Sequence, residues 1–279
     1  MGDYEERFSG IGRLYGADAL PRLRAAHVCI IGVGGVGSWI VEALARSGIG
    51  ALTLIDADDV CVTNTNRQLP ALASTVGRPK VDVLAERARA IWPGCVVTAR
   101  AEFFTQSNAI ELLEPAFDFV VDAVDRMSTK THLIHTCRTL NRRVLVCGAA
   151  GGRRDPTAIR AVDLGFAGQD ELLRQVRRKL RRDYGWEHGT CKHATPMGVP
   201  CVFSPEHPVY PHTDGSCRPV AEDEASLRMD CASGFGAATH ITGVFGFIAA
   251  SEIIRRIALE QEKGTPAADR YGPLRVSES

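Results

Sequence analysis

The sequence lacks a net charge, closely paired cysteines and an uninterrupted apolar run of membrane-spanning length. Basic and acidic residues both number 33, so bulk electrostatics favour neither nucleic acid nor a membrane surface. The nine cysteines are scattered without a C-x-x-C pair, which predicts a reducing compartment and no structural zinc site. Residues 1–10 are polar and acidic, unlike a secretory signal. We therefore expect a cytoplasmic protein.

The longest apolar stretch, residues 233–254, is interrupted by His240 and by several glycines, serines and threonines. A hydropathy scan can flag such a stretch as membrane-spanning, but these interruptions make it marginal as a span. The pattern favours a helix buried against a sheet.

Short apolar runs alternate with helical patterns between residues 28 and 148, which predicts a doubly wound, mostly parallel α/β sheet of the Rossmann type. Strands are predicted at residues 28–33, 51–56, 96–101, 117–122 and 144–147, and helices at 36–47, 80–91, 107–113 and 128–141. Beyond a glycine-rich turn, the pattern predicts strands at 157–164 and 201–204 and helices at 169–184 and 235–259.

No long linker divides the chain, so we expect a single domain over residues 1–259. Within it, residues 26–150 form a nucleotide-binding core and residues 151–259 a C-terminal elaboration for substrate binding or dimerisation. The polar tail, residues 260–279, is expected to be disordered.

A glycine-rich turn, GVGGVGS at residues 32–38, joins the first predicted strand to its helix. Such a turn lets the backbone of Gly34 and Gly35 approach a phosphate at the helix N-terminus. Asp56 ends the second strand, where a carboxylate can bind a ribose hydroxyl. These two features alone describe an NAD site as well as an ATP site.

The loop after the second strand favours ATP over NAD. Asn66, Arg67 and Gln68 fall close together, and Lys80 opens the next helix. Arginine and lysine neutralise the phosphoryl oxygens of a triphosphate. Asp125 lies just past the fourth strand, where one carboxylate can join phosphate oxygens around Mg²⁺. The set suits attack by a substrate carboxylate on the α-phosphate of ATP.

Several long segments resemble the adenylating domain of the ubiquitin-activating-enzyme superfamily, and within it the dehydratases of threonylcarbamoyladenosine in tRNA. The resemblance covers nearly the whole chain and is carried by RFSGIGRLYG (7–16), GVGGVGS (32–38), DDVCVTNTNRQ (58–68), DAVD (122–125), CGAAGGRRDPT (147–157) and MDCASGFGAATHITGVFGF (229–247).

The resemblance implies that ATP adenylates the threonyl carboxylate of the modified adenosine and that the neighbouring carbamoyl group closes a ring, releasing AMP. It further implies a homodimer in which an N-terminal arginine, with Arg7 and Arg13 as candidates, reaches the partner's site, and a link to a cysteine desulfurase or sulfur acceptor. By motif position, ATP would be held by Gly34, Gly35, Asp56, Asn66, Arg67, Gln68 and Lys80, and Mg²⁺ by Asp125, with Arg67, Lys80 and Asp125 serving catalysis.

Other roles stay open for some of these residues. Arg67 and Lys80 taken singly are compatible with solvated surface charges, and Asp125 with a helix cap. Cys231 could be a nucleophile, but intramolecular cyclisation needs none and cysteines are often simply buried.

A basic helix is the local candidate for tRNA contacts. Four of its arginines are candidates, although such a charge run can equally form a solvated helix face; they are Arg174, Arg177, Arg178 and Arg181.

The sequence fits three other functions less well. Activation of the C-terminus of a ubiquitin-like sulfur carrier uses the same chemistry, but those relatives carry two C-x-x-C pairs that this chain lacks. A non-catalytic nucleotide-binding scaffold would not need a complete phosphate-transfer set. An NAD oxidoreductase would need a hydride-site acid or base, and none is apparent.

Overall fold

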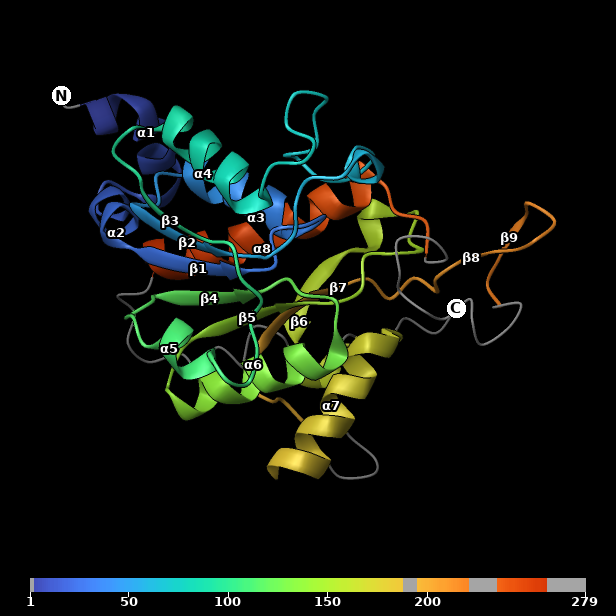
Figure 1. Cartoon of the computed structure of the whole chain (residues 1–279). Helices are drawn as coiled ribbons and strands as arrows, with labels where there is room; N and C mark the ends of the chain where they lie inside the picture. Colours follow the sequence, from blue (N-terminus) through green and yellow to red (C-terminus); the bar gives the residue numbers. More distant parts are fainter. Residues whose placement is uncertain (1–2, 188–194, 221–234, 260–279) are drawn as a thin grey trace.

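The computed structural model describes residues 3–187, 195–220 and 235–259, and its centre is one seven-stranded sheet (Figure 1). The strand order is β3-β2-β1-β4-β5-β7-β6, with every pairing parallel except that between β6 and β7. This confirms the predicted doubly wound α/β sheet. The strands are β1 (His27–Ile31), β2 (Ala51–Ile55), β3 (Val96–Arg100), β4 (Phe119–Asp122), β5 (Val144–Cys147), β6 (Arg160–Asp163) and β7 (Pro200–Phe203).

Helices cover both faces of the sheet (Figure 1). One layer contains α1 (Asp3–Tyr15), α2 (Ala19–Ala25), α3 (Gly37–Arg46), α4 (Lys80–Ile91) and α8 (Thr239–Leu259), and the other contains α5 (Ala109–Leu113), α6 (Met127–Thr139) and α7 (Glu171–Tyr184). Each layer packs on its own apolar core. Successive side chains of β1 point to opposite faces of the sheet, so Val28 and Ile30 join the core under the first layer while Cys29 and Ile31 join the core under the second.

The apolar stretch near the C-terminus forms most of α8, which is buried against α2 and α3 and the sheet. The helix begins at Thr239, four residues later than predicted. Among the described residues, no helix is both long and apolar enough to cross a membrane.

Further features differ from the prediction. The helices α1 and α2 and the small hairpin of β8 (Tyr210–Pro211) and β9 (Cys217–Arg218) had no clear signal in the sequence. The strand predicted at residues 157–164 is wrong at its start. Residues Pro156–Ala158 form the 3₁₀ helix η2, because the Asp155 side chain accepts a hydrogen bond from the Thr157 amide and proline cannot donate to a ladder.

The sheet continues from the predicted nucleotide-binding core into the C-terminal elaboration, since β7 pairs with β5. The chain reaches β7 only after making β6 and α7, so β7 inserts between two strands that precede it in sequence. The tail predicted to be disordered, residues 260–279, lies outside the described residues.

Candidate active site

A cavity of about 980 Å³ opens at the carboxyl ends of β1, β2, β4 and β5, where ligands bind in sheets of this type. Apart from Gln68, every residue predicted to hold ATP or metal lines it. Those residues are Gly34, Gly35, Asp56, Asn66, Arg67, Lys80 and Asp125.

The glycine turn is held open by the close packing around it. Gly32 has φ +85°, and a Cβ on Gly37 would lie 1.9 Å from the Gly32 carbonyl oxygen. A Cβ on Gly34 would instead meet no atom nearer than the Gln68 amide nitrogen at 3.6 Å. The turn therefore needs glycine for its own geometry at two positions, and it leaves space beside Gly34 for a phosphate to approach the backbone.

Asp56 ties this turn to the end of β2. Its Oδ2 accepts a hydrogen bond from the Val33 amide at 2.8 Å, and its Oδ1 accepts one from the Asp58 amide at 2.9 Å. Burial raises the pKa of Asp56, while these two amides and Lys80 oppose the rise. Each oxygen keeps a second lone pair for a ribose hydroxyl.

The two cations predicted to bind phosphate both face the cavity. Lys80 is 5% exposed and its Nζ donates to Asp58 Oδ2 at 2.8 Å, so it is not a solvated surface charge. Arg67 Nη1 donates to the Thr63 carbonyl and to Asn66 Oδ1. These contacts place two positive charges beside the glycine turn.

Gln68 supports the turn without lining the cavity. It is 8% exposed, and within the described residues its Oε1 has no hydrogen-bond partner. Its amide lies against Gly34, so its contact is with the turn that borders the cavity.

Asp125 is exposed, and no described residue makes a hydrogen bond to its side chain. The alternative that Asp125 caps the following helix is wrong, because Arg126 occupies the N-cap of α6 and no side chain caps that end. Asp122, by contrast, is fully buried and accepts a hydrogen bond from Lys130 Nζ at 2.8 Å. Among the described residues that line the cavity, Asp125 is therefore the carboxylate left free, and Mg²⁺ typically takes one or two carboxylates besides phosphate oxygens.

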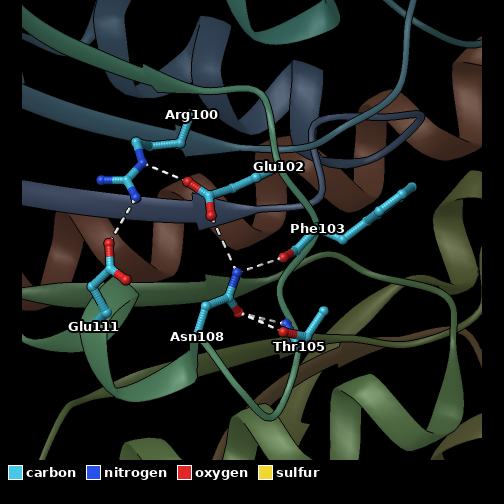
Figure 2. Close-up of polar contacts among 6 residues, drawn as sticks. All are labelled: Arg100, Glu102, Phe103, Thr105, Asn108 and Glu111. Carbon is cyan, nitrogen blue, oxygen red and sulfur yellow. Dashed lines mark hydrogen bonds and ion pairs between the residues drawn. The ribbon is translucent and has the colours of Figure 1, made fainter.

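The loop after β3 adds residues that the sequence analysis missed. Glu102, Phe103, Phe104 and Thr105 line the cavity, and Asn108 holds the loop by hydrogen bonds (Figure 2). The available signal was the Thr105-x-x-Asn108 spacing after a strand, which is typical of a side chain that organises a turn.

The arginines of α7 do not act alike. Arg177 is turned inward, where its Nη1 donates to the carbonyls of Ala167 (2.5 Å) and Leu164 (3.3 Å), and burial lowers its pKa. Arg181 is half-buried, with no described partner for its Nε. Arg174 and Arg178 are exposed, and Arg182 continues their row one turn further.

The two uncertain candidates stand apart from the cavity. Arg13 is exposed at the end of α1, donates to Ser9 Oγ and does not line the cavity of its own chain. Cys231 lies outside the described residues. Within the described ranges, no three histidine, cysteine or acidic side chains gather as a metal site.

Comparison with known proteins places this site in a family. The ThiF family model matches residues 9–271. A tRNA threonylcarbamoyladenosine dehydratase from Haemophilus influenzae is 47% identical over 255 residues, covering 91% of this chain and 94% of the relative.

Two further comparisons bear on the nucleotide and on the substrate. The crystal structure of the Escherichia coli tRNA N6-threonylcarbamoyladenosine dehydratase in complex with ATP superposes with a TM-score of 0.80 at 42% identity, covering 92% of this chain and 96% of that one. A sulfur carrier protein adenylyltransferase from Thermus thermophilus is 35% identical, but over only 48% of this chain and 49% of its own. The chain belongs to the ThiF family, and within it to the tRNA threonylcarbamoyladenosine dehydratases.

Proposed function

We propose that this protein is an ATP-dependent dehydratase that cyclises threonylcarbamoyladenosine in tRNA. The observation that carries the proposal is the cavity itself: a glycine turn, two cations and a carboxylate free of described partners converge there. The chain around them is similar to a named dehydratase over nearly its full length.

The residues support an acyl-adenylate route. A threonyl carboxylate oxygen attacks the α-phosphorus of ATP, and the bond to pyrophosphate breaks. A carbamoyl atom of the same nucleoside then attacks the activated carbonyl, and AMP leaves with the carboxylate oxygen. The nucleoside loses the elements of one water molecule, while ATP becomes AMP and pyrophosphate.

The protein's contribution to this route is positioning and charge neutralisation. The turn at Gly34 and Gly35 holds the phosphates, Asp56 accepts from the ribose, and Arg67 and Lys80 offset charge on the phosphoryl oxygens. Asp125 would hold Mg²⁺, which supplies further neutralisation of the triphosphate. None of these roles requires a protein nucleophile, so Cys231 is not needed for the proposed route.

A basic stripe supports tRNA as the substrate carrier. We define it as Arg174, Arg178 and Arg182, which recur every four residues along the exposed side of α7. The helix begins beside the cavity, since Leu172 lines it, and leads away for 14 residues. Spacing of about 6 Å between successive arginines suits the phosphates of one RNA strand.

The assembly in the cell completes the proposal. We expect a cytoplasmic homodimer in which Arg13 approaches the partner's cavity, together with sulfur transfer from a cysteine desulfurase or to an acceptor. The support for these points is the family resemblance.

The test uses the purified protein with ATP, Mg²⁺ and tRNA bearing threonylcarbamoyladenosine. The expected result is a nucleoside lighter by one water molecule, with AMP and pyrophosphate formed in equal amounts. An unchanged nucleoside, together with adenylation of a sulfur carrier's C-terminus, would replace the proposal with the sulfur-carrier function.

A further inference from the structure

The loop between β3 and α5 is held in one conformation by a single amide side chain. Asn108 Oδ1 accepts hydrogen bonds from the Thr105 amide (2.8 Å) and the Thr105 hydroxyl (2.9 Å). Its Nδ2 donates to the Phe103 carbonyl (2.9 Å) and to Glu102 Oε2 (3.2 Å). Asn108 thus uses all four of its hydrogen-bonding positions on this loop (Figure 2).

A second layer of charges supports the same loop from outside. Arg100, the last residue of β3, donates to Glu102 Oε1 at 2.6 Å and to Glu111 Oε1 at 3.1 Å. Glu102 therefore joins Arg100 to Asn108, and the loop is connected to both the strand and the helix that flank it (Figure 2).

This fixed loop presents an aromatic ring to the cavity. Phe103 and Phe104 both line the cavity, but Phe103 is 65% exposed, whereas Phe104 is 5% exposed and packs into the core. In Figure 2 the ring of Phe103 points away from Asn108 and from the charged side chains. A large apolar ring held in the open by its own backbone is suited to a flat apolar ligand surface.

The order of the strands in the sheet indicates which part of a bound nucleotide would lie against the Phe103 ring. Asp125 follows β4, the glycine turn follows β1, Asp56 follows β2, and Phe103 follows β3. These strands are neighbours in that order, and the Asp56 amide also donates to the Arg100 carbonyl at 3.2 Å. A nucleotide with its phosphates at the turn and its ribose at Asp56 therefore places its base at the β3 loop.

We propose that Phe103 stacks on the adenine base of ATP and that Asn108 is the positioning residue that holds the ring in place. The inference rests on ATP being the nucleotide of the proposed function. It adds a base-binding wall to the phosphate and ribose contacts, and it explains why so many hydrogen bonds converge on an otherwise open loop.

The first test measures nucleotide binding by calorimetry, without tRNA. Phe103→Ala should weaken both ATP and AMP by about tenfold to a hundredfold, the range expected for loss of one aromatic–base stack. Inorganic tripolyphosphate, which has no base, should bind as it does to the wild type. Ile110→Ala is the matched control, because Ile110 is 60% exposed on the neighbouring helix but does not line the cavity.

The second test gives a spectroscopic signature. Phe103→Trp should restore ATP affinity, and its added fluorescence should be quenched by ATP and AMP but not by tripolyphosphate. Adding Asn108→Ala to this variant should reduce the quenching and raise the KM for ATP, while kcat at saturating ATP changes little. Asn108→Asp keeps the acceptor for Thr105 but loses the donors, so it should fall between these two.

The outcomes separate this inference from the proposed function. If Phe103→Ala binds ATP with the affinity of the wild type, the stacking role is overturned. If the same variant then binds tRNA more weakly, the ring contacts RNA instead. An equal loss of tripolyphosphate binding would also overturn it, since the defect would then lie at the phosphates. Normal base-dependent ATP binding without any dehydration of tRNA would instead contradict the proposed function and leave the stacking role intact.

Discussion

At the scale of single residues, the cavity combines charged side chains that already have partners with one carboxylate that has none among the described residues. Lys80, Arg67 and Asp56 are each held by hydrogen bonds before any ligand binds. Asp125 is exposed at the end of the same cavity. Held groups lose little entropy on binding, and a free carboxylate is available to a metal ion.

Replacing Asp125 by Asn should remove activity without affecting the fold. We expect dehydration to slow by at least about a hundredfold, because charge neutralisation at the phosphates depends on the metal that this carboxylate would hold. The urea unfolding midpoint should stay at the wild-type value. Asp18→Asn is the control, since Asp18 is an exposed carboxylate outside the cavity that makes no side-chain cap. Retained turnover in the Asp125 variant would end its metal assignment.

Lys130 and Asp122 form a buried ion pair behind the cavity. Burial raises the pKa of Asp122 to about 6, and Lys130 keeps it from rising further. Lys130 Nζ also donates to the Cys147 carbonyl at 2.9 Å, which links α6 to the end of β5. The pair therefore supports both strand ends that frame the Asp125 side of the cavity.

Lys130→Met should destabilise the protein by about 3–5 kcal/mol at pH 8, because it leaves a buried carboxylate without its counterion. The loss relative to wild type should shrink as the pH falls from 8 towards 6, and it should be small at pH 5. Without Lys130 the pKa of Asp122 rises above its wild-type value of about 6, so the variant protonates this carboxyl first and thereby loses the unpaired charge. Below pH 6 the carboxyl is protonated in both proteins, and the attraction that the variant lacks is absent from the wild type as well. Urea unfolding across this pH range measures the effect, and a loss independent of pH would contradict it.

At the scale of elements, the crossing of α8 over α3 depends on one glycine. A Cβ on Gly246 would lie 2.6 Å from Trp39 Cβ and 3.0 Å from the Val36 carbonyl oxygen. Both helices are anchored there by Arg67, whose carbonyl accepts hydrogen bonds from Trp39 Nε1 and Thr242 Oγ1. The close crossing thus keeps α8 beside the loop that carries Arg67.

Gly246→Ala should lower the free energy of unfolding by about 1–3 kcal/mol, because the added methyl group has no space at this crossing. Gly243→Ala, one turn earlier, should be neutral or stabilising by up to about 1 kcal/mol, since its Cβ would meet atoms only at 3.9 Å and alanine favours helix. Thermal or urea unfolding of the two variants tests the contrast. Equal effects would mean that the crossing is not limited by Gly246.

At the scale of the whole molecule, a net charge of zero conceals a local asymmetry. The basic stripe of Arg174, Arg178 and Arg182 lies on α7, in the helix layer opposite α3 and α4 (Figure 1). Its ion pairs, such as Arg174 with Glu171, are exposed and therefore weak enough to be exchanged for phosphate.

Replacing all three stripe arginines by Gln should weaken tRNA binding and lower the slope of log affinity against log salt by about 2 units. ATP affinity should stay unchanged. The matched control replaces Arg24, Arg46 and Arg78 by Gln. Arg24 and Arg46 lie on α2 and α3, and Arg78 lies two residues before α4, so this control removes the same charge from the side of the sheet opposite α7. Equal losses of tRNA affinity in the two triple variants would show that only net charge matters.

Elements marked by local sequence signals were predicted well, whereas those that depend on contacts between distant segments were not. The strand at Val144–Cys147 and the helix at Lys80–Ile91 were predicted to the residue, because apolar runs and Pro79 mark them locally. The family was also predicted from motifs. The helix α1 was missed, since its burial depends on Tyr4 and Phe8 packing against Trp92 far along the chain.

The sequence by itself determined the fold class and pointed to the residues proposed to bind phosphate, because a glycine turn and its flanking strands are local patterns. Only the tertiary structure decided which side chains are free to act. It paired Asp122 with Lys130 but left Asp125 exposed, turned Arg177 inward and Arg178 outward, and set Phe103 on a fixed loop at the cavity. The burial of a side chain and its hydrogen-bond partners depend on segments that are distant in sequence, so no local pattern specifies them.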